Sequence, residues 1–247
     1  MRIPHVIKAI IVLTPACFTG GLPSQEESVT HPDPRVWLEP CSPLEAADGQ
    51  FLEYQYRLAK VLDLRDYLSN DSGPPVARLL ASAGHDPEWV VSIYHPQHSG
   101  CFVKATMARR SVWRTNSHPD GRPFWHRSAR IRATTHLATI PCVLAAQAEA
   151  VWQGMLGRLR MPQTGDPGFT GGTTTFIVSS PDGNMGHAIC GQTYHPPVAS
   201  PVEALTTTGQ MLFDYAQTPA ALQPEMQEKI HASLDEIVRR SASAEGK

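Results

Sequence analysis

Histidines and cysteines are the residues of this chain whose spacing could support metal chemistry. His95, His98 and Cys101 follow one another at intervals of three, and His187 and Cys190 repeat that interval in the second half. Imidazole and thiolate are both zinc ligands, and close spacing can bring two of them onto one ion. Neither set has the carboxylate or fourth ligand of a complete zinc signature, and oxidised cysteines cannot bind metal. We therefore expect no metal site and no cofactor, with His95 and His98 as the remaining candidates for one.

The cysteine count indicates disulfide chemistry. The chain has five cysteines, an odd number that leaves one thiol over in an oxidising compartment. If Cys17 takes no part in a disulfide, the other four cysteines can form two disulfides, in any of three pairings. Four separate buried thiols are the alternative. The four candidates are Cys41, Cys101, Cys142 and Cys190.

Nucleophilic and acid–base catalysis have no local support in the sequence. The chain contains no G-x-S-x-G, S-x-x-K or H-E-x-x-H motif. Glu149 and Asp182 are isolated carboxylates, with no partner placed by sequence. Acids from separate loops could still meet in space. The sequence therefore favours a non-catalytic protein but does not exclude an enzyme.

The strongest anomaly of charge lies in the middle of the chain. Eight basic residues and one acid, Asp120, lie between Lys104 and Arg132. Strand alternation places these cations on the outer face of a hairpin, where arginine beside aromatic residues suits an acidic protein or an anionic envelope component. A solvated face that pairs with acidic helices is the alternative. The binding candidates are Lys104, Arg110, Trp113, Arg130, Arg132 and His136.

The first seventeen residues have the composition of a secretory leader. Arg2 and Lys8 precede the apolar run from Ala9 to Leu13, which ends in Thr14-Pro15-Ala16-Cys17. Ala16-Cys17 resembles the lipobox of bacterial lipoproteins, although that family usually places leucine three residues before the cysteine and Leu13 is four before it. The resemblance covers the leader alone. It implies that Cys17 carries a lipid and becomes the new N-terminus. Ordinary signal cleavage a few residues later and an uncleaved cytosolic N-terminus are the alternatives.

Charge and hydropathy limit the partners of the remaining chain. Without Arg2 and Lys8, 19 basic and 23 acidic residues remain, a net charge of −4. This balance argues against nucleic acid, whose binding normally needs a basic footprint. No later apolar stretch approaches the roughly 20 residues that a membrane-spanning helix needs. Contact with a membrane is therefore expected through the lipid alone.

Periodicity predicts an α+β domain with an antiparallel sheet of about five strands, and helices before, between and after it. The expected order is ααβββαββαα, with hairpins in place of crossover helices. Two capping boxes, Ser42-Pro43-Leu44-Glu45 and Ser200-Pro201-Val202-Glu203, begin helices. The predicted helices are 43–69, 75–83, 141–160, 201–216 and 224–240, and the predicted strands are 89–94, 101–113, 124–137, 173–179 and 186–194.

These observations predict three parts: a signal peptide at 1–17, a flexible tether at 18–43 and one α+β domain at 44–247. We expect an exported protein, tethered to a membrane (the outer membrane is the first choice) in the periplasm, or secreted. Its expected role is that of a non-catalytic binding module of the inhibitor, immunity or assembly type, acting through the basic sheet face. A periplasmic hydrolase of cell-wall material, with a histidine and acid site formed only by the fold, is the alternative.

Overall fold

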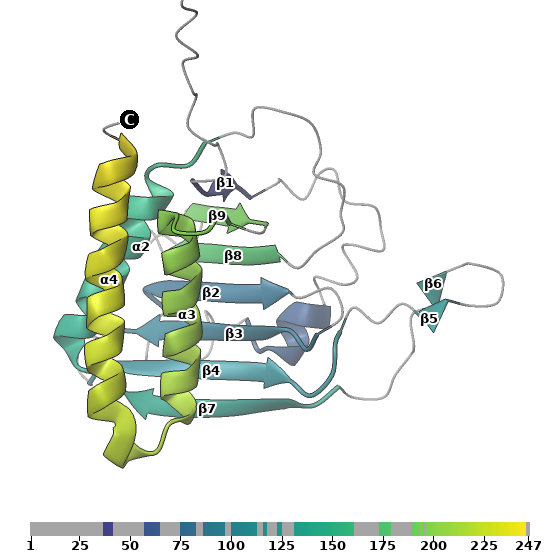
Figure 1. The fold of residues 1–247 in the computed structure, drawn as a ribbon. Helices are drawn as coiled ribbons and strands as arrows, with labels where there is room; N and C mark the ends of the chain where they lie inside the picture. Colours follow the sequence, from purple (N-terminus) through teal and green to yellow (C-terminus); the bar gives the residue numbers. More distant parts are fainter. Residues whose placement is uncertain are drawn as a thin grey trace, which may run out of the picture. The chain divides into compact units, whose positions relative to one another are not determined.

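An antiparallel sheet with helices on one face forms the domain (Figure 1). The computed structural model describes residues 37–41, 57–64, 75–82, 86–96, 100–112, 116–117, 123–124, 131–160, 173–178, 189–194 and 196–245. The sheet has seven strands in the order β1-β9-β8-β2-β3-β4-β7, and all its neighbours pair antiparallel. The predicted α+β class is therefore confirmed, with two more strands in the sheet than expected.

The elements keep the numbering of Figure 1. The sheet strands are β1 (Glu39–Pro40), β2 (Ala77–Ser82), β3 (Trp89–Tyr94), β4 (Phe102–Ala108), β7 (Ala133–Thr139), β8 (Thr173–Val178) and β9 (Ile189–Thr193). The strands β5 (Asn116–Ser117) and β6 (Pro123–Phe124) form a separate pair. The helices are α2 (Cys142–Leu156), α3 (Pro201–Gln217), the 3₁₀ turn η4 (Ala220–Leu222) and α4 (Gln223–Glu245).

The predicted helix at 75–83 is wrong, because this segment contains the central strand β2. β2 pairs with β3 on one side and with β8 on the other. The alternation of apolar and polar residues that marks a half-buried strand is weak in β2, because both faces of the strand are covered. Leu79 lies in the main core, whereas Arg78 is buried on the opposite face. Alanine, leucine and arginine are also strong helix formers, so composition and pattern both favoured the wrong element.

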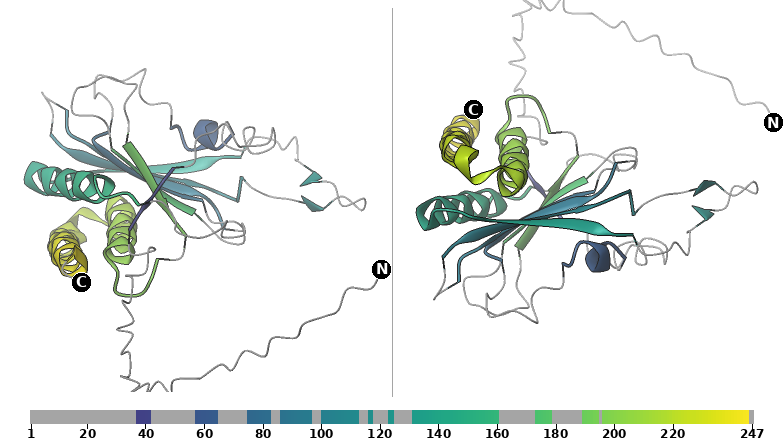
Figure 2. Two further views of the ribbon diagram at one scale, coloured as in Figure 1. Left: turned by 90° about the horizontal axis from the view of Figure 1, so that it is seen from above. Right: turned by 90° about the horizontal axis from the view of Figure 1, so that it is seen from below.

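The main core lies between the sheet and the helices. α2 contacts β8, α3 contacts β4, and α4 packs against both helices (Figure 2). Trp152, Phe176 and Leu205 are fully buried in this layer. The opposite face of the sheet carries a helical segment at residues 57–61, whose Leu58 joins a smaller apolar cluster.

The second capping box is confirmed. The Ser200 hydroxyl accepts a hydrogen bond from the Glu203 backbone N–H at 3.0 Å, and the Glu203 carboxylate accepts one from the Ala199 N–H. The first bond satisfies a donor that the first turn of a helix leaves free, and the second holds the residue before the N-cap. The first capping box, at 42–45, lies outside the described residues.

The domain begins before residue 44, where the sequence placed its start. Leu38 is fully buried in the main core, and the two residues of β1 pair with β9. The guanidinium groups of Arg158 and Arg160 lie over the Trp37 ring. Residues 37–41 therefore pack as part of the folded domain, and 39–40 pair with its sheet. The leader, Cys17 and the rest of the tether lie outside the described residues.

None of the helices in the described part of the chain is both long enough and apolar enough to cross a membrane.

Candidate functional site

Lys104 is held within the fold. Its ammonium group lies 3.0 Å from an Asp63 carboxylate oxygen, and its side chain is 16% exposed. Asp63 follows the helical segment that covers this side of the sheet. A partly buried cation that already pairs with a carboxylate offers little to an outside ligand. Lys104 thus follows the alternative interpretation of the basic stretch in that it pairs with an acidic residue, Asp63.

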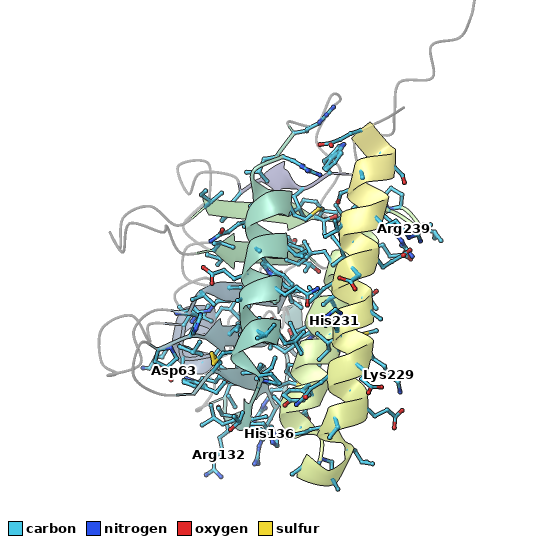
Figure 3. The ribbon with its side chains drawn as sticks, turned by 90° about the vertical axis from the view of Figure 1, so that its left-hand side faces the viewer. Asp63, Arg132, His136, Lys229, His231 and Arg239 are labelled. Carbon is cyan, nitrogen blue, oxygen red and sulfur yellow. A yellow bond between two sulfur atoms is a disulfide. The ribbon has the colours of Figure 1, made fainter. Side chains whose placement is uncertain are left out.

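The prediction that Lys104 and His136 share one face is wrong. The register pairs Lys104 with Leu137 and Ala105 with His136, so His136 lies on the helix side of the sheet. Figure 3 places Asp63 on the side of the sheet away from α4, and His136 toward α4. Leu137, which pairs with Lys104, is 65% exposed on β7, the last strand of the sheet. An edge strand can expose apolar residues, so apolar alternation does not identify its buried face.

Three arginines remain exposed and lie near one another, at the corner of the sheet where β4 ends and β7 begins. Arg109 and Arg110 directly follow β4, and the Arg109 N–H donates a hydrogen bond of 2.9 Å to the Arg132 carbonyl. Within the described residues, none of their guanidinium groups forms an ion pair. We call this group the arginine corner. Two predicted binding residues, Arg110 and Arg132, belong to it, whereas Trp113 and Arg130 lie outside the described residues.

Two buried charged residues were not singled out by the sequence analysis. Arg78 donates hydrogen bonds to the Ser92 hydroxyl at 2.9 Å and to the Leu64 carbonyl at 3.2 Å. Glu88 is fully buried and accepts one from the Val112 N–H at 2.6 Å. Buried charges need such partners, because their desolvation is costly. Both residues fasten irregular segments to the outer face of the sheet. No spacing in the sequence distinguishes them from exposed charges.

All four candidate cysteines form disulfides. Cys41–Cys190 joins the residue after β1 to β9, and Cys101–Cys142 joins the residue before β4 to the first residue of α2. Two disulfides were predicted, and the structure selects one of the three possible pairings. Both bonds connect segments far apart in the sequence, so each restricts the unfolded chain strongly.

His95 lies beside the second disulfide. One ring nitrogen of His95 and the sulfurs of Cys101 and Cys142 all lie within 4.8 Å of one another. In the part of the chain that the structure describes, no other group of three histidine, cysteine or acidic side chains is arranged to hold a metal ion. His98, the other candidate, lies outside that part. The sequence interval between His95 and Cys101 indicated part of this group, but the approach of Cys142 depends on the fold.

The carboxylates considered for catalysis do not gather around a nucleophile in the described residues. Glu149 lies on α2 and accepts a hydrogen bond from Gln153 on the same helix at 3.1 Å. His231 pairs with Asp235 at 3.2 Å, one turn away on the exposed surface of α4 (Figure 3). Asp182 lies outside the described residues. Such contacts between residues four apart are typical of helix surfaces.

A groove of about 450 Å³ separates the start of α2 from α4. Val143 and Leu144 line it from α2, and Gln227, His231 and Asp235 line it from α4. The Val143 side chain is 82% exposed. The groove is a mostly apolar surface bordered by polar side chains, and it begins next to Cys142.

No family model matches this chain, and no curated protein or solved structure matches it significantly.

Proposed function

We propose that this chain is an exported, lipid-anchored envelope protein whose folded domain is a non-catalytic binding module. The observation that carries the proposal is the pairing of all four domain cysteines in two disulfides. Structural disulfides form and persist in oxidising compartments and are rare in the cytosol. Cys17, the fifth cysteine, is thereby left for the lipid.

The arginine corner is the binding surface that we assign to this module. Arg109, Arg110 and Arg132 are exposed, and they come from two neighbouring strand ends on the ordered sheet. A guanidinium group can form two parallel hydrogen bonds with a carboxylate. Three such groups on a fixed backbone suit a partner that presents several carboxylates. The proposed partner is therefore an acidic protein of the envelope.

Charge reversal tests this assignment. The Arg110→Glu/Arg132→Glu variant should lose the acidic partner when both proteins are used to capture ligands from a native envelope extract. Lys60→Glu/Lys229→Glu changes the net charge equally at exposed positions outside the corner and should keep the partner. Raising the salt concentration should weaken capture by the native protein, since exposed charges are screened. Identical partner lists for the native protein and the Arg110→Glu/Arg132→Glu variant would contradict the assignment.

A further inference from the structure

Three side chains from separate parts of the fold form a compact group beside the sheet. His95 follows β3, Cys101 precedes β4, and Cys142 is the first residue of α2. We call these residues the sulfur–imidazole cluster. His95 and Cys142 are exposed, whereas Cys101 is fully buried. The cluster is therefore anchored from inside the domain and open to solvent on one side.

The backbone around the cluster is fixed by the sheet. Tyr94, just before His95, pairs with Phe102, just after Cys101, at the end of the β3–β4 ladder. The Ile140 N–H donates a hydrogen bond of 3.0 Å to the Cys101 carbonyl, which holds the start of α2 nearby. These contacts do not involve the bond between the two sulfurs. The frame that positions the three ligand atoms can thus persist when that bond is reduced.

The spacing of the cluster suits a tetrahedral zinc ion. Zinc binds thiolate sulfur at about 2.3 Å and imidazole nitrogen at about 2.0–2.1 Å, so the sulfurs of such a centre lie about 3.8 Å apart. The ligand atoms of the cluster all lie within 4.8 Å of one another, and the two cysteine Cα atoms are 5.1 Å apart. Small side-chain rotations are enough to reach a zinc geometry, and water can enter from the exposed side.

Local electrostatics favours a thiolate at Cys142. Cys142 lies at the N-terminus of the 15-residue helix α2, where the helix dipole stabilises a negative charge. The Cys101 N–H also donates a hydrogen bond of 3.2 Å to the Cys142 sulfur. Two thiolates and one imidazole form the ligand type that selects zinc over hard cations such as magnesium.

We propose that the sulfur–imidazole cluster binds one zinc ion when the Cys101–Cys142 disulfide is reduced. A dithiol reductant supplies two electrons and two protons, and it becomes a disulfide while Cys101 and Cys142 become thiols. Zinc binding then releases both protons and leaves a neutral centre of two thiolates, His95 and one water. Disulfide and metal are mutually exclusive, so reoxidation expels the ion. This inference does not depend on the binding role of the arginine corner.

The test uses the full chain with Cys17→Ser, which removes the thiol expected to carry lipid. The protein is reduced, freed of reductant without air and mixed with zinc, and bound metal is measured after gel filtration. One zinc per reduced chain is expected, and none per oxidised chain. Cobalt in place of zinc should give the visible absorption of a tetrahedral thiolate complex. A reduced protein that unfolds or binds no zinc would overturn the proposal.

Variants separate the cluster from other thiols and histidines. His95→Gln should weaken zinc binding at least about tenfold. His231→Gln, which changes an exposed histidine on α4, should leave the affinity unchanged. Cys101→Ser/Cys142→Ser should abolish binding, whereas Cys41→Ser/Cys190→Ser should keep it. If the serine variants do not fold, the histidine pair decides alone, and equal zinc affinities for His95→Gln and the unsubstituted protein would refute the proposal.

Discussion

Gly209 shows how closely α3 approaches the sheet. A Cβ atom added at this position would lie 2.1 Å from the Leu79 Cδ1 atom in the main core. Glycine normally destabilises the interior of a helix, so its presence in α3 needs a reason in the packing. The absence of a side chain is what allows α3 to lie directly over β2. Gly209 therefore lowers the intrinsic stability of α3 but allows the helix to pack closely on the sheet.

Substitution of this glycine should reveal the close approach. We expect Gly209→Ala to lower the free energy of unfolding by about 1–3 kcal/mol, because the new methyl group must displace Leu79. Gly154→Ala, inside α2 with no atom within 4 Å of the added Cβ, should instead raise it by up to about 1 kcal/mol. Urea unfolding of the three proteins measures both effects. Stabilisation by both substitutions would show that α3 does not pack so closely.

At the level of single residues, the sequence predicted which side chains form disulfides better than it predicted which side chains contact each other. All four domain cysteines were expected to form disulfides, but their pairing depends on which strand ends meet. The spacing between His95 and Cys101 in the sequence indicated that these two residues could lie close together. Cys142 could not be found in this way, because it follows β7 and comes near His95 only when β7 pairs with β4. Lys104 was taken for a binding residue because Asp63, its partner, lies far away in the sequence.

Among the elements, β1 depends most on a covalent link. It has two residues, and among the described strands its only neighbour is β9. The Cys41–Cys190 disulfide lies directly beside this short ladder. Two paired residues are too few to hold a strand in place by hydrogen bonds alone. The disulfide is therefore expected to provide much of the stability at this edge of the sheet.

Removal of this disulfide should act first at the edge. The Cys41→Ser/Cys190→Ser variant should lose about 2–5 kcal/mol of unfolding free energy. Amide hydrogen exchange should increase around residues 38–41 more than in β2 and β3, which are central strands. Peptide-level exchange with mass spectrometry measures this difference. Equal increases throughout the sheet would mean that β1 is not a separately stabilised element.

Prediction of the elements succeeded where composition indicated a strand or a capping box indicated a helix, and it failed where neither signal was present. The predicted bounds of β3 agree with the structure, and the helix after Ser200 ends within one residue of α3. β2 and β3 are both buried on two faces, but β2 was taken for a helix because it lacks the β-branched and aromatic residues of β3. The residues of β7 were assigned to the wrong faces because the edge exposes Leu137. Tertiary position, which the local pattern does not contain, decided both cases.

For the whole molecule, the proposed location can be tested apart from the fold. Cys17→Ser should move the protein from the membrane fraction to the soluble envelope fraction of its native host, because a lipid chain is the expected anchor. Mass spectrometry of the native protein should find Cys17 as a lipid-bearing N-terminus. A native protein that keeps Met1 and has free thiols throughout would contradict export.

The position of β1 has a further consequence for how an anchored molecule would face its surroundings. β1 and β7 are the opposite margins of the seven-stranded sheet, and Figure 1 shows them at its two ends. Adjacent strands lie about 4.8 Å apart, so the margins are separated by roughly 29 Å. A leash that enters the domain through β1 leaves Arg110 and Arg132 on the far rim. If the proposed lipid anchor holds the chain at its N-terminal side, those guanidinium groups lie on the side of the domain away from the anchor.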